Sequence, residues 1–191
     1  EIGLSLVGSE MCIRDSGDSA AVTVLRDGKM MNFDISLTPH DRLVPVHIEG
    51  KPPSYYICAG IVFTVVCVPY LRSEYGKDYD YDAPLRLLTK MMHGHKEKPD
   101  DQVVVVSQVL NSDINIGYDD IVNVVVCGVN GKSVRNLREL VKIVEGCKHE
   151  YLKIELDQSI QIVLETKAAK KSTKEILHTH CIPNASSVDL R

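Results

Sequence analysis

The sequence predicts an α+β domain with a mainly antiparallel, partly open β-sheet or barrel that is flanked by helices. Three observations support this class. Short runs of β-branched residues alternate with amphipathic segments, the expected strands come in neighbouring pairs, and glycine and proline residues separate them. From residue 43 the expected order is β–β–α–β–β–α–β–β–α. Because paired short strands favour hairpins over long crossovers, a doubly wound parallel sheet is not expected.

The composition allows one domain of ordinary size, or one domain and part of another. Hydrophobic residues make up 44% of the 191 positions, and the net charge of −4 includes no basic block, so we expect no nucleic-acid partner. No apolar run is long enough to cross a bilayer, and the six cysteines form no CxxC pair. The sequence therefore predicts no membrane segment, no metal site and no cofactor. Single cysteines within expected strands indicate a reducing, intracellular compartment.

The N-terminal residues do not share the pattern of the rest. Residues 1–16 have neither capping residues nor the basic start and apolar core of a signal peptide, and they resemble translated adapter sequence. We therefore exclude them from the fold. Residues 17–38 predict a β-hairpin, because two apolar runs flank the turn signal Asp27-Gly28-Lys29. A lone hairpin is marginal in water, so we expect it to pack on preceding chain, and we expect residues 39–42 to be a linker.

The longest apolar run, residues 55–71, predicts a strand that is buried on both faces. Pro52-Pro53 closes this run on one side and Pro69 ends it on the other. We expect another strand before it, at residues 43–48. Gly60 lies near the start of the run, where a flexible residue can free the N–H groups of a loop to face a ligand.

The other elements of the main domain (43–166) and of the C-terminal helix and tail (167–191) follow from local patterns. Asn136 and Glu139 have the spacing of a capping box, Asn130-Gly131 is a hairpin turn signal, and Gly146 ends a helix. The expected elements are a polar, Tyr-rich loop at 72–82, helices at 83–92, 136–145 and 167–178, and strands at 103–110, 123–129, 151–156 and 160–165.

Possible catalytic and metal-binding motifs are incomplete. Gly17-Asp18-Ser19 is similar to part of the Gly-x-Ser-Gly-Gly sequence around a serine nucleophile, but Ala20-Ala21 replaces the glycines that would form an oxyanion hole. We expect a polar turn there. His93 with His95, and His178 with His180, lack the second ligand pair of a zinc site and are expected to be loop histidines.

Two motifs resemble a known family. Gly117-Tyr118-Asp119-Asp120-Ile121, followed by Asn130-Gly131-Lys132-Ser133-Val134, is similar to the PDZ signature GD-x-I … NG-x-x-V. With Arg42-Leu43-Val44-Pro45, Pro52-Pro53-Ser54-Tyr55-Tyr56 and residues 178–183, the chain resembles the C-terminal region of plant-type Deg (HtrA, protease Do-like) serine proteases. The resemblance implies that residues 17–38 end a first PDZ domain and that residues 43–166 form a second, enlarged PDZ-like domain.

The resemblance also implies a function. It predicts a non-catalytic, peptide- and protein-binding and assembly region of a serine endopeptidase that degrades misfolded or damaged proteins. The implied partners are extended peptide or protein segments and neighbouring subunits, in trimer-based homo-oligomers of the nucleus, chloroplast or mitochondrion. Two alternatives stay open: an active enzyme fragment, and a structural oligomerisation domain whose groove is filled by its own chain and binds no free peptide.

The resemblance places a peptide-binding groove between the apolar run and the helix that begins at Asn136. The carboxylate-binding loop of PDZ domains would correspond to Ala59–Phe63, although Val62 stands where that loop has its second glycine. A peptide would add beside Ile61–Val66. The helix presents either Asn136, Leu140 and Ile143 or Leu137, Val141 and Val144. The predicted site residues are Ala59, Gly60, Ile61, Val62, Phe63, Thr64, Val65, Asn136, Leu140 and Ile143.

Overall fold

The computed structural model describes residues 17–37 and 42–191. The chain divides into two compact units, Glu1–Asp41 and Arg42–Arg191, and we describe each by itself. The predicted adapter sequence, residues 1–16, and residues 38–41 of the linker region lie outside the described residues.

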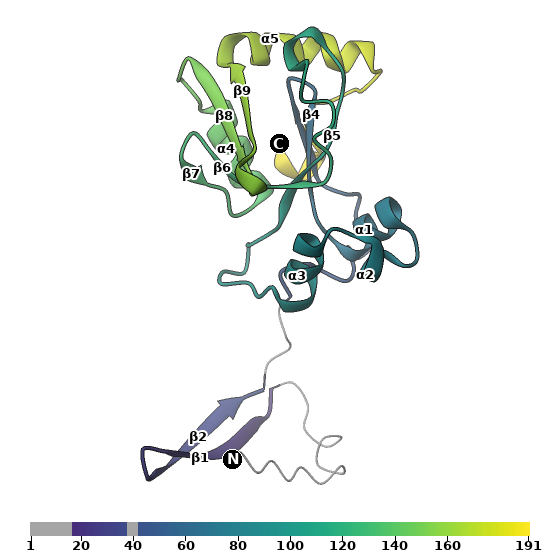
Figure 1. The fold of residues 1–191 in the computed structure, drawn as a ribbon. Coiled ribbons are helices and arrows are strands. Elements are labelled where there is room, and N and C mark those ends of the chain that lie inside the picture. Colours follow the sequence, from purple (N-terminus) through teal and green to yellow (C-terminus); the bar gives the residue numbers. More distant parts are fainter. Residues whose placement is uncertain (1–16, 38–41) are drawn as a thin grey trace. The chain divides into compact units, whose positions relative to one another are not determined.

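The first unit contains the hairpin that the sequence predicts. Strands β1 (Ser19–Arg26) and β2 (Lys29–Ser36) pair antiparallel along their whole length (Figure 1). Asp27 and Gly28 join them with φ of 51° and 74°. Both angles are left-handed, and this is the backbone that a two-residue hairpin turn requires. Ser19 begins β1 and pairs with Ser36, so the serine of the Gly17-Asp18-Ser19 motif lies in a strand.

The second unit is built on an antiparallel sheet with the strand order β3-β4-β5-β6-β8-β9, and β7 pairs with β6. The first and last strands of this order, β3 and β9, pair with one neighbour each, so the sheet is open and the predicted α+β class is confirmed. The strands are β3 (Tyr55–Cys58), β4 (Ile61–Val65), β5 (Val104–Val109), β6 (Val124–Val129), β7 (Lys132–Ser133), β8 (Tyr151–Leu156) and β9 (Gln161–Glu165).

Helices flank this sheet at both ends. Figure 1 shows α5 across one end of the strands and α1–α3 grouped at the other. The predicted helices at 83–92, 136–145 and 167–178 are confirmed as α3, α4 and α5. The helices are α1 (Val68–Tyr75), α2 (Tyr79–Asp82), α3 (Leu85–His93), α4 (Leu137–Glu145) and α5 (Thr166–Thr179), with short 3₁₀ turns at Asp113–Asn115, Asp157–Ser159 and Val188–Leu190.

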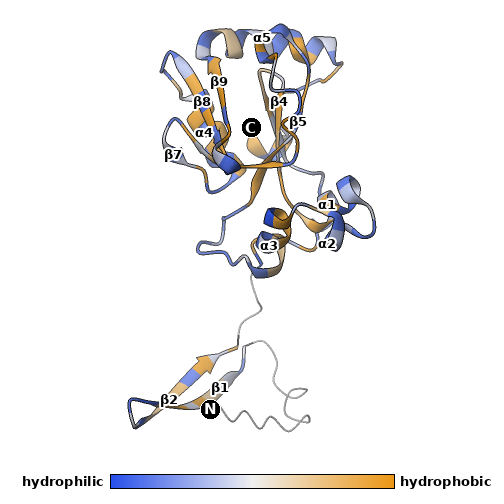
Figure 2. Ribbon diagram, in the orientation of Figure 1, coloured by the Kyte–Doolittle hydropathy of each residue, from blue (hydrophilic) through white to orange (hydrophobic). Residues whose placement is uncertain are grey.

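The second unit has two hydrophobic cores that share strand β5. Val104 and Val106 point into the larger core, which the sheet forms with α4 and α5. Val103 and Val105 point into a smaller core with α1 and α3. Because successive side chains of a strand face opposite sides, this strand is buried on both faces. Figure 2 shows the hydrophobic stretches of β4, β5, β8 and β9.

The apolar run at 55–71 is not one strand, which corrects the prediction. Ala59 and Gly60 have φ of 51° and 84° and make a two-residue turn, so Tyr55–Cys58 and Ile61–Val65 pair as a hairpin. Pro69 then lies in the first turn of α1, where its missing N–H leaves no helical bond unmade. A hydrophobic pattern alone cannot show such a turn, because Ala59-Gly60 carries no polar turn residue.

Two further predictions are wrong. Residues 43–48 form no strand. Val44 is only 1% exposed because it packs into the smaller core, and Arg42, just before this segment, makes an isolated bridge with His95. The predicted loop at 72–82 instead holds the end of α1 and all of α2. These helices pack Leu71 into the smaller core, and Tyr75 and Tyr79 lie against it. Tertiary packing thus stabilises helices in a segment with weak local signals.

The predicted cap of α4 forms, with one difference. The Asn136 side-chain oxygen accepts a hydrogen bond from the Glu139 N–H at 2.8 Å. The Glu139 carboxylate accepts from the N–H of Arg135 at 3.0 Å rather than from that of Asn136. Helix α4 therefore begins where the sequence predicts, and Gly146 follows its last residue.

Candidate functional site

Strand β4 was expected to be the peptide-binding edge, and the structure makes it an interior strand. It pairs with β3 on one side, from Cys58↔Ile61 to Tyr55↔Thr64, and with β5 on the other. Its main-chain groups are therefore used within the sheet, and the prediction of strand addition beside Ile61–Val66 is wrong. The turn inside the apolar run is the reason, because it makes β3 the outer strand. Of the predicted residues on β4, Ile61, Phe63 and Thr64 are buried, and Val62 and Val65 are half-buried.

The predicted carboxylate-binding loop at Ala59-Gly60 is also occupied by internal contacts. The Ala59 N–H donates to Thr173 Oγ1 of α5 at 2.8 Å, and the Ala59 carbonyl accepts from the buried Asn115 side chain at 2.8 Å. The Gly60 carbonyl accepts from the Leu110 N–H at 2.8 Å. A Cβ at Gly60 would lie 2.4 Å from the Leu110 oxygen. This turn packs the hairpin against α5 and leaves no room for a ligand carboxylate.

The edge of the sheet that does hold an extended segment is β3. Residues 184–190 return along it after α5, and we name them the return segment. The Ile57 N–H donates to the Ala185 carbonyl at 2.7 Å, and the Ser187 N–H donates to the Tyr55 carbonyl at 3.0 Å. Tyr56 and Ser186 form an antiparallel bridge between these bonds. The return segment therefore adds to the sheet as a short extra strand, the mode in which extended peptides bind exposed sheet edges.

Side chains fix the register of the return segment. Ser187, which is 7% exposed, accepts the Tyr55 N–H on its hydroxyl at 3.1 Å. The Ser54 hydroxyl donates to the Asp189 carboxylate at 2.7 Å, and the Arg138 guanidinium donates to the Asp189 carbonyl at 2.5 Å. Burial alone would raise the pKa of Asp189, but hydrogen bonds from Ser187 and Ser54 outweigh it and hold this pKa below its ordinary value.

The turn after α5 directs the chain back to β3. Cys181 adopts a left-handed φ of 55°, and the Ile182 N–H donates to the Leu177 carbonyl at 2.8 Å. This is a helix-terminating arrangement, and Pro183 prevents further helical hydrogen bonding. Figure 1 shows the yellow segment turning back from α5 toward the sheet.

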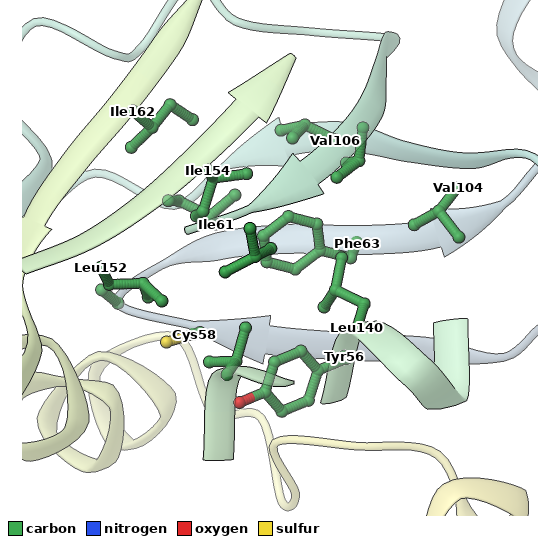
Figure 3. Close-up of a cluster of buried hydrophobic side chains, with 14 of the residues drawn as sticks. Tyr56, Cys58, Ile61, Phe63, Val104, Val106, Leu140, Leu152, Ile154 and Ile162 are labelled. Carbon is green, nitrogen blue, oxygen red and sulfur yellow. The ribbon is translucent and has the colours of Figure 1, made fainter. Parts of the chain in front are cut away.

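Helix α4 forms the wall opposite the return segment. In Figure 3 the Leu140 side chain lies between Phe63 of β4 and Tyr56 of β3. The Tyr56 hydroxyl donates to the Glu145 carboxylate at 2.6 Å, which ties the far end of α4 to β3. Burial, together with neighbouring Cys58 and Glu145, raises the pKa of Tyr56 well above its ordinary value, so the phenol stays protonated and can donate.

The residues predicted on α4 have mixed positions. Leu140 is 0% exposed and belongs to the core beneath the groove. Asn136 caps the helix, and Ile143 is half-buried against the larger core. Among the described residues, neither predicted face of α4 makes a hydrogen bond with the return segment. Arg138 does, and Glu145 holds β3, so charged residues line this wall.

Two cavities lie against the ends of the return segment. A cavity of about 520 Å³ lies at the start of α4, where Arg138 and Ser54 face Asp189 and Leu190. A second cavity of about 230 Å³ lies at the other end of β3, between Cys58, Lys170 and Ala185. Both ends of the return segment therefore border open space.

The residues that hold the return segment, which the sequence did not reveal, lie on the outer strand and at its ends. Tyr55 and Ile57 act through main-chain atoms, which carry no side-chain signal. Ser54, Arg138 and Asp189 are ordinary surface residue types, and only their meeting in space identifies them. The available signal was Pro52-Pro53, because prolines before a strand are typical of an edge that has no partner at that point.

Two features are absent from the described part of the chain: clusters of metal-binding side chains and helices able to cross a membrane. In residues 17–37 and 42–191, no cluster of three or more histidine, cysteine or acidic side chains is arranged to hold a metal ion. The same residues include no helix with the length and apolarity needed to cross a membrane. His93 ends α3 and His178 lies in α5, so two of the predicted loop histidines are helical.

Comparison with known proteins agrees with this architecture. The family model of the PDZ domain matches residues 44–189, which include the whole sheet of the second unit. The chain belongs to the PDZ domain family. The resemblance stated from the sequence motifs is thereby confirmed, and the strand addition on β3 occurs in a fold that binds extended segments in this way.

Relatives of this PDZ chain carry the name protease Do-like. "Protease Do-like 2, chloroplastic" of Arabidopsis thaliana is 36% identical over 92% of the chain, which covers 28% of that protein. "Putative protease Do-like 3, mitochondrial" and "Protease Do-like 4, mitochondrial", from the same plant, are each 38% identical over about nine-tenths of the chain. The chain spans 28–30% of the length of these relatives.

Proposed function

We propose that this PDZ chain is a non-catalytic, protein-binding and assembly region of a Deg/HtrA-type serine endopeptidase, and that extended protein segments bind between β3 and α4. One observation carries the proposal: the chain's own residues 185–187 add to β3 through main-chain hydrogen bonds. An edge that accepts one extended segment has the donors and acceptors for others, because these bonds do not depend on side chains.

The proposal extends to the longer protein of which this chain would be one region. Relatives named as proteases support a longer protein that is a protease and that removes misfolded or damaged proteins. Their source in Arabidopsis thaliana supports a plant-type protein. Their names also support a chloroplast or a mitochondrion as its compartment. Assembly with neighbouring subunits into a trimer-based oligomer is part of the same proposal and rests on the family resemblance.

The alternative of a purely structural domain with a self-filled groove is favoured by the same observation. If the return segment never leaves β3, no free segment can add there. The two functions differ in one measurable property, which is saturable binding of an unfolded protein by the unmodified chain, in which residues 184–190 can still occupy β3.

A binding assay with labelled casein, an unfolded protein, tests the proposed function. The full chain carrying Ser187→Pro loses the N–H that bonds the Tyr55 carbonyl and the hydroxyl that accepts the Tyr55 N–H, which uncovers β3. We expect fluorescence anisotropy to show saturable binding without cleavage. Absence of binding, with circular dichroism and thermal unfolding that show a folded variant, would overturn the peptide-binding function.

Two substitutions of Tyr55 in the Ser187→Pro chain locate the site. Tyr55→Pro removes an N–H that faces away from β4 at the first residue of the strand, a position that tolerates proline. Tyr55→Ala removes the same side chain and keeps the N–H. We expect weaker casein binding for proline than for alanine. Equal binding by the two variants would place the site elsewhere, and casein hydrolysis that survives purification would contradict a non-catalytic role.

A further inference from the structure

We propose that the return segment is an exchangeable occupant of the groove between β3 and α4, and that the groove selects protein segments with the pattern Ser-x-Asp-Leu found at Ser187–Leu190. The inference rests on the proposed function and adds its selectivity and its regulation. The partner is thus an extended segment with a hydroxyl, an acid two residues later and an aliphatic residue after the acid. In the unliganded chain residues 184–190 compete with it.

Each position of the pattern has a contact that explains it. The Ser187 hydroxyl is buried and accepts the Tyr55 N–H at 3.1 Å. The Asp189 carboxylate accepts the Ser54 hydroxyl at 2.7 Å. Leu190 is half-buried against the larger core and lines the cavity at the start of α4. Val188 is 80% exposed, so its side chain is free to vary. The required and the variable positions therefore follow from burial and hydrogen bonding.

The return segment is held by few interactions. Two main-chain hydrogen bonds join it to β3, and its other bonds come from the Tyr55 N–H and hydroxyl, the Ser54 hydroxyl and the Arg138 guanidinium. Pro183, Asn184 and Val188 are exposed. A segment with few buried apolar contacts opens at a lower free energy than the strands of the core. Its release would leave β3–β4 pairing and the contacts of Leu140 in place.

The turn between α5 and the return segment makes the release local. Ile182 is bonded to Leu177, so the helix end is fixed, while Pro183 and Asn184 after it are exposed. A segment tethered so closely has an effective concentration in the millimolar range, and it competes strongly with segments from other proteins. The groove would then respond only to a segment that matches it well or that is presented at high local concentration.

A labelled peptide with the sequence of Ile182–Arg191 tests the inference in the full chain. Ser187→Pro is a mild way to release the segment, because Ser187 already has a φ of −63°, the value that proline imposes. Val188→Ala is the matched control, since it changes an exposed side chain in the same segment. We expect Ser187→Pro to bind the peptide at least about tenfold more tightly than the unmodified chain and Val188→Ala to bind as the unmodified chain does.

Peptide variants test the pattern itself. With the Ser187→Pro chain we expect peptides in which the residue equivalent to Ser187 is alanine, or that equivalent to Asp189 is asparagine, to bind several-fold more weakly. Alanine at the position of Val188 should not matter. Equal affinities across these peptides would overturn the selectivity. Equal affinity of the unmodified and Ser187→Pro chains for the parent peptide would overturn the competition.

A second releasing variant guards against a folding defect in the first. Asp189→Lys removes the carboxylate that accepts the Ser54 hydroxyl and places a positive charge near Arg138. It should bind the peptide more tightly than the unmodified chain, and failure of both folded variants to bind would overturn the inference. Casein distinguishes the two proposals. If the variants bind casein but show no preference among the peptides, the protein-binding function stands and the Ser-x-Asp-Leu selectivity is overturned. If they bind the peptide but not casein, the groove serves only its own segment and the protein-binding function is overturned.

Discussion

The two edges of the sheet in the second unit are protected in different ways. The outer side of β3 is covered by a piece of backbone, the return segment, which bonds to Tyr55 and Ile57. The outer side of β9 is covered by a side chain: the Tyr118 hydroxyl accepts the Val163 N–H at 3.1 Å and donates to the Val163 carbonyl at 3.3 Å. Two of the three exposed residues of β9, Gln161 and Glu165, are also polar or charged.

The difference shows why one edge is suited to ligand exchange and the other is not. Strand addition replaces one backbone by another with the same donors and acceptors, so the β3 edge can change its partner at little cost. A phenol that bonds both main-chain groups of a single residue blocks an incoming strand, and exposed polar or charged side chains further disfavour edge pairing. The same sheet therefore has one exchangeable and one blocked edge.

The largest expected effect comes from the wall beside the β3 edge. Leu140 is fully buried between Phe63 and Tyr56, so Leu140→Ala should lower the free energy of unfolding by about 2–5 kcal/mol. Urea denaturation followed by circular dichroism measures this. Val163→Ala on β9, where the side chain is 38% exposed, is the control and should cost less than about 1 kcal/mol. Similar losses would mean that the β3 wall is not part of the core.

The turn that makes β3 the outer strand should be the next most sensitive place. An alanine at Gly60 would have a φ of +84° and a Cβ 2.4 Å from the Leu110 carbonyl oxygen. Strain and overlap together predict a loss of more than about 2 kcal/mol. Gly131→Ala in the turn between β6 and β7 has a φ of +74° but no atom within 4 Å, and it should lose about 1 kcal/mol from backbone strain alone. Equal thermal shifts for the two variants would contradict the close packing at Gly60.

The predictable part of this fold consists of elements whose signals are local. The hairpin turn at Asp27-Gly28, the cap at Asn136 and strand β5 depend on neighbours in sequence or on one strand's pattern, and each was predicted from these residues. The turn at Ala59-Gly60 was not, because its left-handed residues are buried and apolar. Asn115 and Thr173, far away in the sequence, hold the turn in place.

The site was harder to predict than the fold for a related reason. Sequence motifs predicted a peptide-binding groove between the apolar run and α4, and α4 does pack beside β3 in the structure. The choice between β3 and β4 as the edge depended on that hidden turn, which shifted the edge by one strand. The occupant could not be seen either, since Ser187 and Asp189 meet Tyr55 and Ser54 only in the folded chain.

A smaller effect should follow from uncovering the blocked edge. Tyr118→Phe removes the hydroxyl that bonds both polar groups of Val163. We expect a loss of about 1 kcal/mol in stability and faster amide hydrogen exchange at Val163, measured by NMR, because the freed groups can bond water. The variant should gain no casein binding, since exposed Gln161 and Glu165 still flank the position. Casein binding by Tyr118→Phe would contradict the contrast between the edges.

The smallest expected effect is a weakening of the return segment in acid. Because hydrogen bonds hold the pKa of Asp189 below its ordinary value, the carboxylate's contribution is fully present above the unfolded value of about 3.9. That contribution is lost as the pH falls through the lower folded pKa, when protonation weakens the bond from Ser54. The NMR protection factor of the Ser187 amide should therefore drop below about pH 4 relative to that of the Val163 amide on β9. Asp189→Asn should abolish this dependence, and a drop that persists in Asp189→Asn would assign it to another acid rather than to the β3 edge.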